Sequence, residues 1–139
     1  MQFSTRTTYG LRAMINLAKN SHACAGKRNT SVSLASIAKD EHISKKYLER
    51  LFMKLKSAGL VKSVKGAKGG YQLTKKPEQV SIYELVKILE GKVSPFYCLA
   101  ENGKIDCRGQ KKCGALKVLV KVQQVVNITL KQMKLSDLL

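Results

Sequence analysis

Three of the four cysteines lie close together in the chain. Cys98, Cys107 and Cys113 have the spacing C-x8-C-x5-C. Thiolates grouped in this way bind soft metal ions or iron–sulfur clusters, or act as redox-active thiols. Structural zinc is disfavoured because paired C-x2-C spacing and nearby histidines are missing. The segment also carries four basic residues that would offset the negative charge of a thiolate–iron site: Lys104, Arg108, Lys111 and Lys112.

A second set of informative side chains belongs to a short basic stretch. Lysine and arginine donate hydrogen bonds to guanine or to phosphate, whereas glutamate can accept one from cytosine. Because phosphates repel a carboxylate, Glu49 indicates selection among bases rather than bulk affinity for DNA. The alternative is an ordinary solvated helix face. The candidate DNA-binding residues of this stretch are Lys45, Lys46, Tyr47, Glu49 and Arg50.

Two further lysines flank a glycine-rich turn. Residues 60–65 and 71–73 are rich in strand formers and predict a hairpin with Gly66–Gly70 at its tip. Because glycines let a backbone approach phosphates closely, Lys65 and Lys68 are candidates for contacts with the DNA backbone or the minor groove. A generic surface hairpin is the alternative.

These side chains require a helical scaffold. Apolar residues at helical spacing, serine caps and glycine stops predict helices over about 4–20, 33–39, 44–58, 81–91 and 114–133. The turn Asp40–His42 is expected to separate the second helix from the third. Two short helices followed by a basic hairpin are typical of a winged helix-turn-helix, whose second helix enters the major groove. The expected fold is mainly α with a small two-stranded β wing.

The last helix is apolar on more sides than one small domain can cover. A second copy of the chain would cover the remainder, so the pattern predicts a homodimer joined by this long C-terminal helix. The main apolar face is expected to comprise Ala115, Val118, Leu119, Val122, Val126, Leu130 and Met133.

Composition limits the function classes. The chain has 139 residues, 26 basic against 9 acidic side chains and a formal net charge of +17, which favours a polyanionic partner. With 44% hydrophobic residues it can still form a core. No signal peptide or membrane-spanning run is present, so we expect a cytoplasmic protein with no membrane partner. Motifs typical of enzymes are also missing. A basic structural nucleic-acid-binding protein is an alternative from another class.

Long stretches of the chain resemble the IscR/NsrR/CymR family of bacterial dimeric regulators. The resemblance is carried by MQFSTRTTYGLRAMINLA, ISKKYLERLFMKLKSAGLVKSVKGAKGGYQL and LVKILEG, and it covers nearly the whole chain. It implies a winged-helix domain whose long C-terminal helix crosses to its twin. It also implies DNA contacts at Ser44, Lys46, Tyr47, Glu49, Arg50 and Lys65.

The same resemblance bears on the cysteines. Some family members hold an iron–sulfur cluster on three cysteines before the dimer helix, whereas others lack them and respond through a partner enzyme of cysteine metabolism. Here the second cysteine gap matches the cluster-binding members and the first is longer. The resemblance therefore implies a [2Fe–2S] or [4Fe–4S] cluster on Cys98, Cys107 and Cys113.

The fourth cluster ligand departs from the family pattern. Relatives use a histidine or a partner's acidic residue at the positions of Leu116 and about Thr8, and neither side chain can serve here. The other candidates are water, a small thiol, Glu101, Asp106, His22 and Cys24.

These observations define a working hypothesis in three parts. Residues 1–91 are expected to form the DNA-binding domain, 92–113 a cysteine-bearing sensor loop, and 114–139 the dimerisation helix and tail. The chain is expected to repress iron–sulfur or sulfur-metabolism genes from a palindromic operator in double-stranded DNA. The first alternative keeps this DNA binding but senses a small molecule or a partner enzyme.

Overall fold

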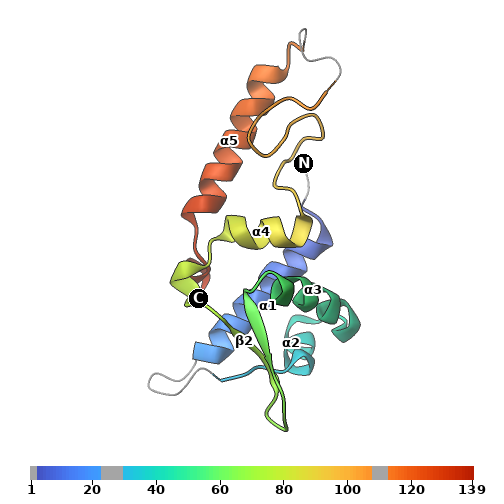
Figure 1. Cartoon of the computed structure of the whole chain (residues 1–139), viewed down its shortest axis with the longest axis vertical. Helices are drawn as coiled ribbons and strands as arrows, with labels where there is room; N and C mark the ends of the chain where they lie inside the picture. The colour runs from blue at the N-terminus through green and yellow to red at the C-terminus, as the bar shows by residue number, and fades with distance from the viewer. Residues whose placement is uncertain (1–2, 23–29, 108–112) are drawn as a thin grey trace.

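The computed structural model describes residues 3–22, 30–107 and 113–139 (Figure 1). The chain forms five α-helices and a two-stranded antiparallel sheet within these ranges. Two short 3-10 helices lie at Pro77–Gln79 and Leu135–Leu138. The main elements are α1 (Thr5–His22), α2 (Leu34–Glu41), α3 (Lys45–Ser57), β1 (Val61–Val64), β2 (Gly70–Leu73), α4 (Ile82–Glu90) and α5 (Leu116–Gln132).

The core lies between α1, α2, α3, α4 and the wing formed by β1 and β2. The apolar stripe of α3 faces this core, as its spacing predicts, and Leu48 and Phe52 are fully buried. Phe52 packs edge-on against Tyr71 beneath the wing, with ring centroids 4.8 Å apart. The mainly helical fold with a two-stranded wing is therefore confirmed.

The helix-turn-helix is fixed by local caps. The Ser33 and Ser44 hydroxyls accept hydrogen bonds from the Ser36 and Tyr47 backbone N–H groups at the starts of α2 and α3. The predicted turn Asp40–His42 is wrong by two residues, because α2 continues to Glu41 and the turn begins at His42. His42 ends α2 in a left-handed conformation with φ 53°, which histidine tolerates better than most residues.

The wing is joined to the rest of the domain by an isolated antiparallel bridge between Val32 and Tyr71 of β2. Val32 and Tyr71 exchange backbone N–H···O hydrogen bonds of 2.9 and 2.8 Å. This contact brings Gly70 so close to Val32 that a Cβ on Gly70 would lie 2.2 Å from the Val32 carbonyl oxygen. The wing therefore needs glycine at this position.

Gly70→Ala is expected to destabilise the fold by about 2 kcal/mol or more, because the new methyl group must displace backbone at a conformation that already disfavours side chains. Urea denaturation measures this loss. Gly114→Ala is the matched control, because a Cβ there meets nothing within 4 Å. Equal stability of the two variants would mean that the wing shifts freely.

α4 and α5 are joined at one end and diverge from it (Figure 1). The Ile82 N–H donates to the Met133 carbonyl at 3.0 Å, and the Leu135 N–H donates to the Val80 carbonyl at 2.9 Å. Beside this junction, Ile82 and Val86 pack with apolar side chains of α5 and its C-terminal turn. Residues 92–106 lie between the two helices farther from the junction.

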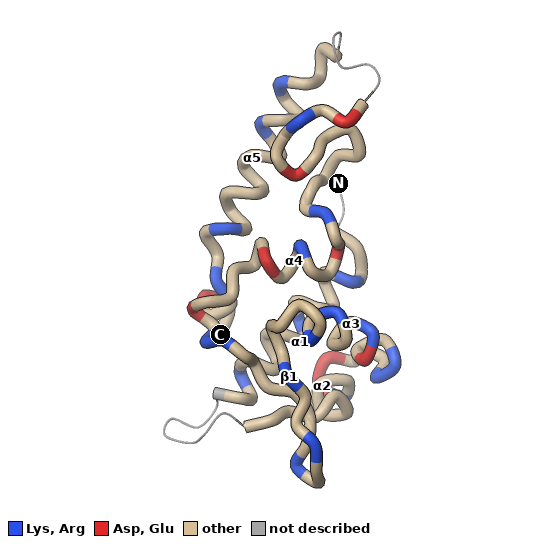
Figure 2. Tube along the Cα trace, viewed as in Figure 1, with Lys and Arg blue, Asp and Glu red and all other residues tan. Residues whose placement is uncertain are grey.

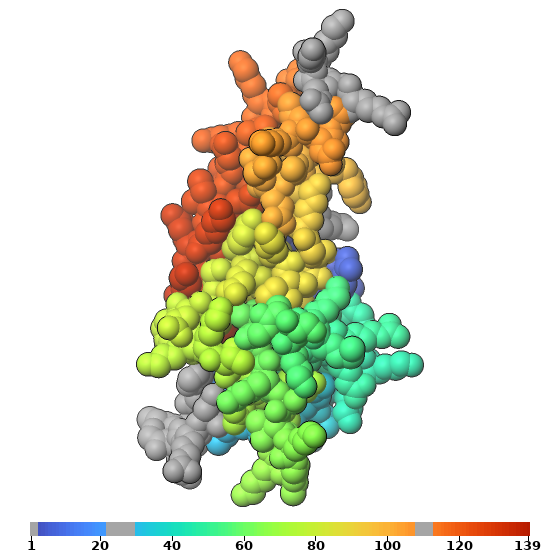
Figure 3. All heavy atoms as spheres, viewed as in Figure 1, coloured from blue at the N-terminus to red at the C-terminus, as the bar shows by residue number. Residues whose placement is uncertain are grey.

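The apolar surface of α5 is divided between two faces. Leu130 and Met133 pack against the α4 cluster of the same chain. Val118, Val125 and Ile128 are 59%, 51% and 54% exposed, and α5 forms one long edge of the molecule (Figure 3). Leu119 and Val122, which belong to the apolar face expected from the sequence, are half-buried in the single chain. Within the described ranges, the helices are too short or too polar to span a bilayer.

Candidate DNA interface and cysteine-bearing loop

One side of α3 is polar and open to solvent. Lys45, Lys46, Glu49 and Arg50 are all exposed, opposite the buried stripe that includes Leu48. Figure 2 shows basic residues along α3 and at the wing tip. The structure therefore presents these sequence-predicted residues on one free helix face, as a recognition helix requires.

Two other candidates on this helix have structural partners. Tyr47 is half-buried and packs edge-on against Tyr9, with ring centroids 5.7 Å apart, and its hydroxyl lies 3.4 Å from Thr5 Oγ1. The Ser44 hydroxyl accepts the Tyr47 N–H at 3.4 Å. Both residues therefore position the start of α3, and their hydroxyls lie beside the exposed cations.

The position of α2 is fixed by polar contacts that the sequence analysis missed. Arg12 Nε donates to Glu41 Oε2 at 3.1 Å, and Asn16 Nδ2 donates to Glu41 Oε1 at 3.1 Å. These contacts join α1 to the end of α2. No local motif marks them, because the partners are separated by more than 20 residues.

The wing lysines lie at the tip of the hairpin. Lys65 and Lys68 are exposed, on either side of the turn between β1 and β2. The Ser31 hydroxyl donates to the Lys68 carbonyl and holds the tip to the preceding segment. Both ammonium groups are therefore free to approach a phosphate backbone.

Glu49→Ala is expected to relax base preference at one position in each half-site while leaving general affinity for DNA unchanged or higher. Lys65→Ala should instead weaken binding to every sequence and lower the salt slope by about one unit per subunit. Binding-site selection and salt titrations distinguish the two outcomes. An unchanged selected sequence for Glu49→Ala would place this side chain outside the groove.

A small hairpin connects the first two clustered cysteines. Leu99 and Ile105 form an isolated antiparallel bridge, and the Asp106 N–H donates to the Cys98 carbonyl at 2.8 Å. The long first cysteine gap is thus folded back on itself. Cys98 and Cys107 come to the open end of the same hairpin, although eight residues separate them in the sequence.

Cys113 lies three residues before α5 begins. Its carbonyl accepts the Leu116 N–H at 3.2 Å, and both its side chain and that of Cys107 are exposed. Among the described residues, no three His, Cys, Asp or Glu side chains are arranged to hold a metal ion. Cys24, Arg108, Lys111 and Lys112 lie outside the described residues.

Two of the positions considered for a fourth ligand are engaged elsewhere. Glu101 Oε2 accepts Lys87 Nζ at 2.9 Å, and Glu101 Oε1 accepts the Val93 N–H at 3.1 Å. The hydrogen bond from Lys87 is the main reason why the pKa of Glu101 lies below its ordinary value. The Thr8 hydroxyl lies 3.3 Å from the Thr5 carbonyl, to which it donates within α1.

The comparison with known proteins covers nearly the full length of the chain. The Rrf2 family profile, described as an iron-dependent transcriptional regulator, matches residues 3–139. The chain belongs to the Rrf2 family. Members of this family and the curated relatives are DNA-binding transcription regulators rather than enzymes.

Two curated relatives and two solved structures are similar to this chain. The HTH-type regulator CymR of Bacillus subtilis is 42% identical over 73% of this chain and 70% of its own length. The regulator IscR of Cereibacter sphaeroides is 33% identical over 100% of this chain and 87% of its own length. The structure of CymR, the global cysteine regulator of B. subtilis, has a TM-score of 0.81 at 32% identity, and the match covers 99% of this chain and 95% of that one. The structure of T. potens IscR has a TM-score of 0.73 at 34% identity, with coverages of 99% and 85%.

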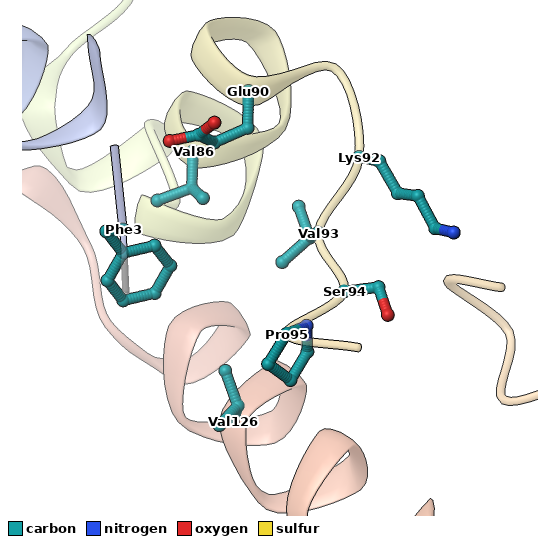
Figure 4. Close-up of a pocket in the computed structure, with 8 residues that line it drawn as sticks. All are labelled: Phe3, Val86, Glu90, Lys92, Val93, Ser94, Pro95 and Val126. Atoms are coloured by element: carbon teal, nitrogen blue, oxygen red, sulfur yellow. The ribbon is translucent and has the colours of Figure 1, made fainter. Parts of the chain in front are cut away.

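In this Rrf2-family chain, Glu90 connects the end of α4 to the start of α1. Its Oε1 accepts hydrogen bonds of 2.5 Å from the Ser4 and Thr7 hydroxyls. Burial opposes ionisation of the carboxyl, but the bonds from Ser4 and Thr7 outweigh it and lower the pKa of Glu90. Phe3, Val86, Val93 and Val126 line a pocket of about 120 Å³ beside this carboxylate (Figure 4).

Glu90→Gln is expected to cost about 1.5–3 kcal/mol at pH 7, the usual contribution of hydrogen bonds to a charged group. Because the folded pKa of Glu90 is lowered, its contribution is complete above the unfolded pKa of about 4.3 and is lost as pH falls through the folded value. Urea denaturation from pH 7 to pH 3 should therefore show wild type and variant converging in acid. Glu84→Gln, which removes an exposed partner of Lys75, is the control; a constant difference for Glu90→Gln would contradict this role.

Proposed function

We propose that the protein is a homodimeric repressor that reads a palindromic operator through α3 and the wing. The observation that carries this proposal is the exposed face of α3, where Glu49 stands among three basic side chains beside the lysine-tipped wing. The cations supply affinity for phosphate, and the carboxylate supplies discrimination among bases.

The exposed apolar stripe of α5 supports the dimer. Val118, Val125 and Ile128 are separated by seven and three residues, which places them on one side of the helix. Apolar side chains that are half-exposed along one face bury their surface when two such helices meet about a two-fold axis. A two-fold protein in turn reads two inverted half-sites.

Selection of duplexes from a random library, followed by footprinting, tests the proposal. We expect one enriched sequence with two-fold symmetry and protection of both half-sites. Protection that spreads evenly along any DNA would contradict the proposal and support a basic structural nucleic-acid-binding protein.

We further infer that the loop senses through an iron–sulfur cluster held by Cys98, Cys107 and Cys113, and that the regulated genes serve iron–sulfur or sulfur metabolism. Three thiolates are a suitable soft donor set, and the hairpin brings Cys98 and Cys107 to one end. The similarity to IscR relatives also favours sensing through a cluster. When bound, a cluster would supply a redox-sensitive group at the start of the dimer helix.

A second sensing mode is favoured by a different observation. CymR of B. subtilis, the global cysteine regulator of that organism, matches at 42% identity. A chain of this type would respond to a small molecule or a partner enzyme instead. Operator affinity of anaerobic protein with and without supplied iron and sulfide separates the modes, because only the cluster mode predicts a difference between the two samples.

A further inference from the structure

The hairpin between Cys98 and Cys107 lies in the opening between α4 and α5 (Figure 1). The two helices are joined at the Val80–Ile82 and Met133–Leu135 end by backbone hydrogen bonds. Because, in the part of the chain that the structure describes, only that end is fixed by backbone pairing, the segment in the opening sets how far the helices diverge. The tip of the hairpin, residues 100–103, therefore lies where it can hold α4 and α5 apart at a fixed distance.

One side of the tip is bound to α4. Glu101 Oε2 accepts Lys87 Nζ at 2.9 Å, and Glu101 Oε1 accepts the Val93 N–H just beyond the helix at 3.1 Å. The Lys87 and Glu101 side chains are 51% and 27% exposed, so the pair is partly shielded from solvent. Glu101 thus fixes the tip to the end of α4.

The other side of the tip is bound to α5. Gln123, which is fully buried, donates from Nε2 to the Ala100 carbonyl and accepts the Ser94 hydroxyl at 2.8 Å. Asn127 Nδ2 donates to the Glu101 carbonyl at 3.3 Å. A single residue, Glu101, therefore contacts α4 through its side chain and α5 through its backbone.

α4 itself packs against α3, which carries the candidate DNA-reading residues, and against α1. Lys54 of α3 donates from Nζ to the Leu89 carbonyl at 3.5 Å. A Cβ added to Gly10 of α1 would lie 2.4 Å from Leu89 Cδ1, so the two helices are in close contact. A displacement of α4 relative to α5 would therefore move the reading helix relative to the dimer helix.

We propose that Glu101 is the positioning residue that transmits the state of the clustered cysteines to the DNA-reading helices. The cysteines lie at the open end of the hairpin and Glu101 lies at its tip, so a change at the thiols moves the tip and with it the angle between α4 and α5. This proposal rests on the sensor function proposed above and assigns its coupling element.

The test compares operator affinities of two anaerobic samples, one metal-free and one supplied with iron and sulfide. The probe is a labelled duplex selected by the wild-type protein, and iron content is measured in each sample. We expect wild type to show about a tenfold difference in Kd between the samples. Glu101→Gln and Lys87→Met should each reduce this difference below about threefold, and the double variant should reduce it no further.

Lys75→Met is the matched control, because it removes the ion pair between Lys75 and Glu84 of α4, which does not involve the hairpin. This variant should keep the wild-type difference. A wild-type protein with equal affinities would contradict the sensor function itself. Retention of the full difference by Glu101→Gln and Lys87→Met would overturn the coupling role alone. Loss of iron by Glu101→Gln, with a normal response by Lys87→Met, would overturn it too and identify Glu101 as a ligand.

Discussion

Val125→Lys is expected to convert the dimer into monomers and to weaken operator binding by about two to four orders of magnitude. The ammonium group would lie in the middle of an apolar seam, where an unpaired charge costs several kcal/mol. Loss of the dimer also removes the gain from linking two half-sites in one molecule. Sedimentation velocity measures the assembly, and fluorescence anisotropy with the selected duplex measures the affinity.

Gln124→Lys is the matched control, because Gln124 is an exposed polar neighbour of Val125, so the same charge is introduced without replacing an apolar side chain. This variant should remain dimeric and should bind the operator normally. A dimeric Val125→Lys protein with wild-type affinity would show that the exposed stripe of α5 is not the contact between subunits.

Cys98→Ala, Cys107→Ala and Cys113→Ala should each abolish the visible absorption and the bound iron of protein prepared without oxygen. A cluster held by three thiolates with a weak fourth ligand tolerates the loss of a thiolate poorly, since each sulfur is a large part of its attachment. Iron and acid-labile sulfide analysis measures the effect. Cys24→Ala, which removes a cysteine outside the cluster motif, should leave both quantities unchanged.

Two outcomes would count against this assignment. Retention of iron by all three variants would place the metal on other residues. Loss of iron in Cys24→Ala as well would contradict the three-cysteine assignment and add Cys24 to the ligands. Far-ultraviolet circular dichroism of each variant shows whether the fold is intact.

Local chemistry in the sequence predicts most of the scaffold. Ser33, Ser44 and Ser81 cap helices because a hydroxyl beside free backbone N–H groups has the same effect in any context. Gly91 ends α4 with φ 85°, as its position indicates. At the start of α4 the Ser81 hydroxyl accepts the Glu84 N–H at 3.1 Å, and the Glu84 carboxylate pairs with Lys75 at 3.3 Å.

Contacts between distant segments account for what the sequence did not reveal. The pairing of Val32 with Tyr71 and the hairpin between Cys98 and Cys107 depend on where the chain returns in space, which no local spacing encodes. The division of α5 into a buried and an exposed face also depends on contacts between distant segments. The spacing of Val118, Val122 and Val126 predicts that they share one side of a helix. Packing then shows that Val126 lies toward α4 and Val118 toward solvent.

The candidate site is predicted better for DNA reading than for sensing. Lys45, Lys46, Glu49 and Arg50 share an exposed face because their positions follow directly from the helix period. The cysteine loop has no such period, so its order depends on single contacts such as Glu101 with Lys87. Sequence spacing identifies the thiols as a group, and the structure adds the hairpin that connects two of them.

The most direct test of the account is the metal content of the wild-type protein. The protein is prepared without oxygen, supplied with iron and sulfide and freed of excess reagent, after which visible absorption, iron and acid-labile sulfide are measured. The account predicts coloured protein with iron and sulfide bound in matching amounts. Colourless protein without bound iron would contradict the cluster and favour sensing through a small molecule or a partner enzyme.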